Sequence, residues 1–307
     1  MATGWITHEA CGAHEMGAWH PESPDRLAAI NDHLIAVGLL PHLVPVAAPR
    51  APLAALQRAH DAEYIEHLRS SIPKRGYQAL DPDTSMNSAT FEAAMRGAGA
   101  VVDGTDRILG GELRNAFCAV RPPGHHATRS RAMGFCFLNN VAVGVLHALH
   151  AHGLQRVALI DFDVHHGNGS EDILSGDERV LMCSFFQHPF YPYSGTDHPA
   201  KNMVNVPLPA GTDGAKVRAV ADQIWLPRLT DFAPEMIFIS AGFDAHREDD
   251  LGQMALVEAD YAYLTAMLMA VAARHAQHRI VSALEGGYNL SALGRSVAAH
   301  VRTLAEI

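Results

Sequence analysis

Short hydrophobic runs alternate with longer amphipathic segments along this chain, and no other feature constrains its fold as strongly. The runs are hydrophobic at nearly every position, which is typical of parallel strands covered on both faces. We predict strands at Gly4–Thr7, Ala116–Val120, Val157–Phe162, Val180–Phe185, Met236–Ser240 and Ile280–Leu284. We predict helices at Pro24–Val37, Asn87–Leu109, Asn139–His152, Asp213–Thr230, Glu258–Gln277 and Leu290–Ala305. This alternation predicts an α/β fold in which a mainly parallel central sheet lies between helical layers.

The length and composition favour one domain over residues 1–307. With 48% hydrophobic residues, the chain can bury a large core. It contains no internal repeat, low-complexity tract or Gly/Ser linker that would mark a domain boundary. The Pro-containing segments Ala47–Pro52 and Pro73–Ser85 are predicted to be loops.

Charge and cysteine content limit the partners and the compartment that we expect. The net charge of −10 disfavours non-specific binding of nucleic acid. The longest mostly apolar stretch, Tyr261–Ala273, is shorter than the roughly 20 residues that span a bilayer, so we expect no membrane insertion. The four cysteines form no C-x-x-C pair, and the first basic residue is Arg26, so we expect a cytoplasmic protein without a secretory signal. The sequence leaves the oligomeric state open, including a homo-oligomer.

Two predicted strands are followed by residues that could bind a metal ion. Asp161, Asp163 and His165 alternate along the chain, which places them on one face of the strand end. Asp244 occupies the matching position after Met236–Ser240, and carboxylates and imidazoles are ordinary ligands of zinc. Three protein ligands with open positions indicate a catalytic metal rather than a structural one. The alternative is a polar strand end satisfied by helix N-termini, with Asp244 as a helix cap.

Two other strand ends carry residues suited to proton transfer. His125 and His126 follow Ala116–Val120, and Tyr288 follows Ile280–Leu284 and two glycines that let the backbone turn. Taken singly, the histidines could lie in a surface loop by chance, and Tyr288 could be a packed aromatic residue. Together with the metal ligands they describe a hydrolase that uses a metal-activated water.

Several segments resemble the histone deacetylase superfamily, over nearly the whole chain and in the order of its motifs. They are HPESPDRL at His20–Leu27, RPPGHHA at Arg121–Ala127, GFCFLNN at Gly134–Asn140, DFDVHHGNG at Asp161–Gly169, AGFDA at Ala241–Ala245 and EGGYNL at Glu285–Leu290. The RPPGHHA and HHGNG forms look like the class II and bacterial amidohydrolase branch, which is related to the acetylpolyamine amidohydrolases. The resemblance implies the single-domain, three-layer arginase/deacetylase fold, one zinc ion, and hydrolysis of N-acetyl or related acyl amides.

The resemblance also implies a role for each matching residue. Zinc would be bound by Asp163, His165 and Asp244, and potassium by Asp161, Asp163, His165, Ser184 and Phe185. The catalytic residues would be His126 as general base, His125 as its acid or electrostatic partner, Tyr288 as oxyanion donor, Asp161 holding His125, and Asn168 orienting His126. Many relatives carry Asp at the Asn168 position. A neutral Asn would orient the base without raising its pKa as a carboxylate would.

Four further positions match the substrate tunnel of the family. The resemblance implies that Phe135 and Tyr191 wall the tunnel, with the carbonyl of Gly134 accepting from the scissile amide. Many relatives have Phe in place of Tyr191, so we expect a more polar tunnel mouth. Leu251 stands where polyamine-specific eukaryotic relatives carry Glu, which favours acyl-lysine proteins or peptides over acetylated polyamines.

We therefore expect a zinc-dependent deacylase of acyl-lysine side chains, with acetylpolyamine deacetylation at the same site as the alternative. A binuclear ureohydrolase of arginase type would need a second Asp where the chain has His246, and it would give Tyr288 no role. A binding protein without turnover would not need the intact histidine pair. The sequence does not distinguish zinc from iron in the cell.

Overall fold

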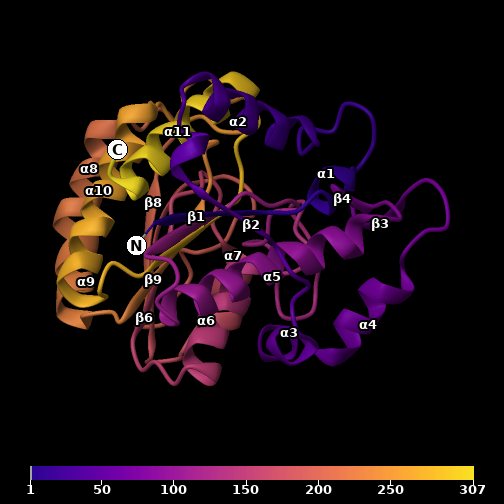
Figure 1. The fold of residues 1–307 in the computed structure, drawn as a ribbon, viewed down its shortest axis with the longest axis horizontal. Coiled ribbons are helices and arrows are strands. Elements are labelled where there is room, and N and C mark those ends of the chain that lie inside the picture. Colours follow the sequence, from indigo (N-terminus) through magenta and orange to yellow (C-terminus); the bar gives the residue numbers. More distant parts are fainter. Residues whose placement is uncertain (1) are drawn as a thin grey trace.

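The computed structural model describes residues 2–307, and the chain within them folds around a sheet of eight parallel strands (Figure 1). The strand order is β2-β1-β5-β10-β9-β6-β7-β8. The strands are β1 (Thr3–Thr7), β2 (Val44–Ala47), β5 (Asn115–Cys118), β6 (Val157–Asp161), β7 (Val180–Gln187), β8 (Met203–Leu208), β9 (Met236–Ala241) and β10 (Ile280–Leu284). A separate antiparallel pair is formed by β3 (Gln78–Asp81) and β4 (Thr84–Met86).

Helices cover both faces of the sheet, as a buried parallel sheet requires. The helices are α1 (Ala10–Ala13), α2 (Asp25–Ala36), α3 (Leu53–Ala59), α4 (Ala62–Ser70), α5 (Thr90–Leu109), α6 (Asn140–Ala151), α7 (Asn168–Leu174), α8 (Gly214–Val220), α9 (Leu226–Phe232), α10 (Glu258–His275) and α11 (Leu290–Ala305). Two short turns complete them, the 3-10 helix η1 (Leu40–His42) and the π-helix η2 (Ala221–Trp225).

Two hydrophobic cores lie on opposite faces of the sheet. One contains apolar residues of α3, α4, α5 and α6, and the other those of α2, α8, α9, α10 and α11 (Figure 1). Strands β5, β6, β9 and β10 are adjacent at the centre of the sheet and buried along their full length. The predicted fold class, three layers around a parallel sheet, is confirmed.

Several strands and helices lie where the sequence analysis predicted none, including the short helices α1 and α7. Strands β2 and β8 form the two edges of the sheet, and β2 follows directly on η1. The β3–β4 pair lies almost entirely within the segment Pro73–Ser85 that we predicted to be a loop. Helices α3 and α4 also went unpredicted, and the predicted helix Asp213–Thr230 is interrupted by η2. Within residues 2–307, no helix combines the length and the apolar composition needed to cross a membrane.

Candidate active site

The ends of the four central strands bring the predicted site residues together. In the sheet the order β5-β10-β9-β6 places the loops that follow these strands side by side, although they are far apart in the sequence. The loop after β5 carries His125 and His126, and the loop after β10 carries Tyr288. Asp244 follows β9, and Asp163 follows β6. The chemistry predicted from each strand end therefore converges at the carboxyl edge of the sheet, where open α/β sheets bind ligands.

The three predicted metal ligands form one compact cluster. One donor atom from each of Asp163, His165 and Asp244 lies within 4.8 Å of the other two. His165 Nδ1 is 3.1 Å from Asp163 Oδ1 and 3.1 Å from Asp244 Oδ2. Both carboxylates are fully buried, and two oxygens and one nitrogen are a donor set typical of zinc.

The raised pKa values of Asp244 and His165 indicate an excess of buried negative charge among the three residues. Burial and the nearby Asp163 carboxylate raise the pKa of Asp244 to about 7. Burial by itself would lower the pKa of His165, but the two carboxylates outweigh it and raise this pKa to about 10. A divalent cation would relieve the repulsion between the carboxylates and displace these protons. The donor set therefore fits a metal ion.

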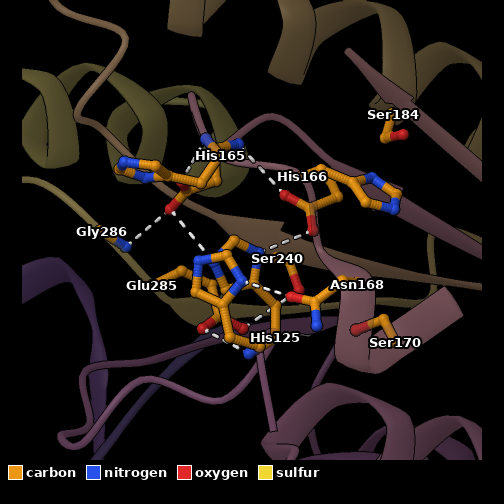
Figure 2. Close-up of polar contacts among 12 residues, drawn as sticks. His125, His165, His166, Asn168, Ser170, Ser184, Ser240, Glu285 and Gly286 are labelled. Carbon is orange, nitrogen blue, oxygen red and sulfur yellow. Dashed lines mark hydrogen bonds and ion pairs between the residues drawn. The ribbon is translucent and has the colours of Figure 1, made fainter. Parts of the chain in front are cut away.

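Backbone groups hold the two carboxylates in place. Asp163 Oδ2 accepts from the Gly286 N–H at 2.9 Å (Figure 2). Asp244 Oδ1 accepts from the Val164 N–H at 2.9 Å. A Cβ atom at Gly286 would lie 2.6 Å from Asp163 Oδ2 and closer still to Asp244 Oδ2. Only glycine leaves room at this position for both carboxylates.

The histidine pair lies against the metal cluster with its rings stacked at a tilt. The ring centroids of His125 and His126 are 4.1 Å apart. His125 Nδ1 is 2.9 Å from Asp161 Oδ2, and its Nε2 is 3.7 Å from Asp163 Oδ2. His126 Nδ1 is 2.8 Å from Asn168 Oδ1, which fixes the ring orientation (Figure 2).

The two histidines differ in charge because they have different partners. Burial lowers the pKa of His126 well below its usual value, and the neighbouring His125 and His165 lower it further. Burial also acts on His125, but the carboxylates of Asp161, Asp163 and Glu285 outweigh it and raise its pKa well above the usual value. One imidazole of the pair is therefore protonated beside a neutral one, which suits an acid and a base.

Tyr288 lines the cavity that leads to the metal ligands, and its loop is held by a carboxylate that the sequence analysis did not assign. Asp249 Oδ2 accepts from the backbone N–H groups of Tyr288 and Asn289, at 2.6 and 3.0 Å. Burial raises the pKa of the Tyr288 hydroxyl well above its usual value, so it stays protonated and can donate. The Arg26 guanidinium lies 4.9 Å from the centre of the Tyr288 ring.

Glu285 is a second carboxyl group that the sequence analysis left without a role. Its fully buried side chain accepts from the backbone N–H groups of Gly124 and His125, at 2.6 and 3.1 Å, and from the Ser240 hydroxyl at 3.1 Å (Figure 2). Burial raises its pKa to about 7. It fixes the backbone that presents the histidine pair. Its place after a buried strand, within the EGGYNL segment, was a usable signal.

A cavity of about 240 Å³ leads to the cluster. It is lined by Asp83, His126, Gly134, Phe135, His165, Phe190, Tyr191, Asp250, Leu251 and Tyr288. All four predicted tunnel residues are among them. A Cβ atom at Gly134 would lie 2.5 Å from His126 Cδ2, so this glycine lets the loop approach the His126 ring. The family resemblance assigned the Gly134 carbonyl as the acceptor for the scissile amide N–H. This carbonyl is 3.2 Å from the Cys136 thiol.

The polarity of the cavity differs from what Tyr191 led us to expect. The Tyr191 hydroxyl is buried and, among residues 2–307, has no hydrogen-bond partner, so it adds no exposed polar group to the mouth. The polar groups come instead from Asp83 and the exposed Asp250. Phe190, which the sequence analysis did not assign, stacks on His165 with ring centroids 5.4 Å apart. Asp83 lies in a segment predicted to be a loop, where no local pattern marked it.

The residues assigned to potassium lie on neighbouring strands. Asp161 on β6 pairs in register with Ser184 on β7, and both are buried. The Ser184 hydroxyl donates to Asn205 Oδ1 at 3.3 Å, and Asp161 Oδ1 accepts from the Asp163 N–H at 3.1 Å. The side chain of Phe185 stacks on Trp225 in the core, which leaves only its backbone carbonyl for an ion.

His246 occupies the position that decides between one metal ion and two, and both of its ring nitrogens face groups of neighbouring residues. His246 stands where a binuclear ureohydrolase would need an acidic ligand. Its Nδ1 accepts from the Glu248 N–H at 3.2 Å, and its Nε2 is 3.5 Å from Glu258 Oε1. His246 is not among the three donors of the Asp163 cluster.

Comparison with known proteins gives one consistent family. The family model described as "Histone deacetylase domain" matches residues 20–304. A probable deacetylase of Archaeoglobus fulgidus is 37% identical over 94% of this chain and 82% of its own length. The human polyamine deacetylase HDAC10 is 34% identical over 99% of this chain and 48% of its own length. The crystal structure of the HDA15 HD domain superposes with a TM-score of 0.93 at 34% identity, covering 99% of this chain and 88% of that one.

Proposed function

Because the chain belongs to the histone deacetylase family, we propose that it is a zinc-dependent amidohydrolase that removes acetyl or related acyl groups from lysine side chains. One observation carries the proposal. Asp163, His165 and Asp244 converge at a cavity that also contains the base His126 and the donor Tyr288. A set of metal ligands, a neutral imidazole and a protonated phenol within one cavity are the parts that amide hydrolysis requires.

The bound ion would act as a Lewis acid on the attacking water and on the acyl carbonyl. His126, neutral because of burial, accepts the proton that the water loses as it attacks the carbonyl carbon. His125, held by Asp161, carries the positive charge beside it. The proton returns from this pair to the departing amine, and the products are acetate and the free lysine side chain.

Tyr288 stabilises the negative charge that develops on the carbonyl oxygen. Its hydroxyl is protonated because burial raises its pKa, so it donates a hydrogen bond that strengthens as the charge grows. Asp249 and Arg26 hold its loop and its ring. The tyrosine does not belong to the metal cluster, so its loss should reduce turnover without reducing metal binding.

The potassium site of the proposal consists of Asp161 and Ser184 with the backbone carbonyls of Asp163, His165 and Phe185. The register between β6 and β7 supports it, because it sets Asp161 and Ser184 opposite each other. An ion there would stiffen the strand end that carries the catalytic carboxylates.

The cavity walls support acyl-lysine as the substrate. Phe135 and Leu251 are apolar and suit the methylene chain of lysine. Asp83 and Asp250 add negative charge, which favours substrates with further positive charges, such as lysine-rich peptides. The same carboxylates favour acetylated polyamines, and one relative is named a polyamine deacetylase. Deacetylation of polyamines is therefore the second candidate.

A substrate panel tests the proposal. Acetyl-lysine peptides, longer acyl-lysines and acetylated polyamines are compared by kcat/KM, with the metal content of the same preparation measured by elemental analysis. We expect turnover of acetyl-lysine, a higher kcat/KM for it than for acetylated polyamines, and one tightly bound divalent ion per chain.

Three variants connect this turnover to the site. Asp163→Ala and Asp244→Ala should lose both the ion and the activity, whereas Asp231→Ala, which removes an exposed carboxylate on α9, should lose neither. Two tightly bound transition metals, full activity without any metal, or no turnover across the panel would contradict the proposal. A higher kcat/KM for acetylputrescine or acetylspermidine would instead favour the second candidate.

A further inference from the structure

A second group of metal-binding side chains lies between α5 and α6, outside the active site. Asp106 lies in the last turn of α5, His147 near the end of α6, and His152 directly after α6. His147 Nε2 and His152 Nε2 are 2.7 and 2.6 Å from the same oxygen, Asp106 Oδ1. One donor atom of each residue lies within 4.8 Å of the other two. Three donors thus point at one small volume between two helices.

The cluster lies near the amino ends of the strands, on the opposite side of the sheet from the active site at their carboxyl ends. Helices α5 and α6 pack side by side, and each runs back along the sheet into the start of the next strand, β5 or β6 (Figure 1). Their C-terminal ends therefore lie near the amino ends of the strands, whereas the catalytic residues follow the carboxyl ends. Nothing in the proposed reaction uses these three residues.

The local field at this position favours a cation. Both helices present their C-terminal ends, which carry partial negative charge, and Asp106 adds a carboxylate. The guanidinium of the adjacent residue, Arg107, is paired with Asp103 at 2.7 Å and with Glu112 at 2.8 Å, so it does not compete for Asp106.

The spacing of the donors suits a small tetrahedral ion. Bonds of about 2.0–2.1 Å in a tetrahedron hold neighbouring ligand atoms about 3.3 Å apart. The two N···O distances of 2.7 and 2.6 Å would have to open by roughly 0.6 Å, which side-chain rotation provides because Asp106 and His152 are partly exposed. Two imidazoles and one carboxylate with an open fourth position are ligands that zinc accepts and that magnesium and calcium do not prefer.

We propose that Asp106, His147 and His152 form a second, exchangeable zinc site that links the C-terminal ends of α5 and α6. Water or a ligand from another molecule completes the coordination on the exposed side. The site binds more weakly than the catalytic cluster, because His152 and Asp106 must be held in place at the surface. Zinc bound there stabilises the folded chain, since the unfolded chain does not bring the three donors together.

Zinc binding to the full-length chain tests this site separately from the active site. The Asp244→Ala variant removes a catalytic ligand and serves as the background. Chelator-treated, dialysed protein is titrated with ZnCl2 by calorimetry, and the stoichiometry is checked by equilibrium dialysis with elemental analysis. We expect one remaining site in this background, and we expect ZnCl2 to raise its Tm.

Asp106→Asn and His152→Ala, each added to the same background, should weaken the remaining site at least about tenfold, the lower end of what loss of even an outer-shell partner costs. The matched control is His150→Ala, which removes an exposed imidazole of α6 that is outside the cluster. It should leave both the affinity and the Tm increase unchanged.

The proposal is overturned if the Asp244→Ala background binds no zinc, or if the Asp106→Asn and His152→Ala variants bind it as well as His150→Ala does. Circular dichroism without zinc identifies any variant that has failed to fold. His147→Ala then gives an independent test of the same site. These outcomes do not depend on whether the active site turns over acyl-lysine.

Discussion

Replacing Gly286 with alanine should remove the catalytic metal while leaving the fold intact. The added Cβ would lie 2.6 Å from Asp163 Oδ2, and ordinary van der Waals contact begins at 3.4 Å. The carboxylate would have to retreat by about 0.8 Å, and that of Asp244 by more, whereas metal–ligand distances tolerate only about 0.2 Å. Gly286 has no φ in the left-handed region, so alanine is compatible with the backbone and the effect comes from contact alone.

We expect the Gly286→Ala protein to lose at least about tenfold in zinc affinity, with turnover falling in proportion to the bound metal. The assay is elemental analysis of the dialysed protein, together with kcat of the same preparation measured without added zinc. Gly12→Ala is the matched control, because no atom lies within 4 Å of the added Cβ there. Full zinc content and full kcat in Gly286→Ala would refute the assignment of the two carboxylates as ligands.

Three further predictions follow from the structure. Tyr288→Phe should lower kcat by about 10²–10³-fold with little change in KM or zinc content, because it removes one oxyanion donor, whereas near-full kcat would show that the residue is misassigned. Leu251→Glu should raise kcat/KM for acetylated polyamines relative to acetyl-lysine, and an unchanged ratio would show that Leu251 does not contact the substrate. The pKa values of His60 and His300 in the folded chain, about 4 and about 3, lie below the value in the unfolded chain. Between pH 7 and pH 5 only the unfolded chain therefore gains protons at these two residues, and the free energy of unfolding should fall by about 2 kcal/mol per histidine. Urea unfolding at both pH values measures this fall, and His60→Asn or His300→Asn should each flatten the profile; a profile as steep as that of the unchanged protein would contradict the reasoning.

The central strands could be predicted from the sequence because both of their faces are buried. A mostly hydrophobic run such as Val157–Phe162 is typical of a buried parallel strand, and its first five residues form β6. The edge strands β2 and β8 gave no such signal. Each contains a proline, Pro45 or Pro207, which an edge strand tolerates because one of its sides forms no ladder bonds. Their pairing is decided by the neighbouring strand rather than by their own sequence.

The interrupted helix at Gly214–Phe232 has a similar explanation. The prediction of one helix over Asp213–Thr230 began correctly, because the Asp213 side chain accepts from the Lys216 N–H and caps the start. Pro227 then lacks the N–H that the next turn would use, and the π-helical turn η2 precedes it. The hydrophobic pattern continues through this point, so the pattern alone did not show the interruption.

The metal ligands, the histidine pair and Tyr288 could be predicted because each follows a strand, but the contacts of the supporting carboxylates Asp249 and Glu285 could not. The residue types at the ends of β5, β6, β9 and β10 indicated chemistry one loop at a time. That these four strands are neighbours depends on the order of the whole sheet, which no local pattern encodes. Asp249 acts on the backbone of Tyr288, 39 residues away, and Glu285 acts on that of His125, 160 residues away. Contacts of this kind appear only once the topology is known.

The glycines of the site show why a motif can be recognised before its physical reason is understood. We expected both glycines before Tyr288 to let the backbone turn, and this holds for Gly287, whose φ is +120°. Gly286 is different, because its backbone suits any residue and only the space taken by the two carboxylates excludes a side chain. Gly242 is restricted for the same reason, since a Cβ atom there would overlap the Asp163 carboxylate from the β9 side. Asp163 is therefore enclosed by glycines of the loops that follow β9 and β10, so the spacing of the proposed metal ligands is set by the backbone of these loops as much as by the ligands themselves.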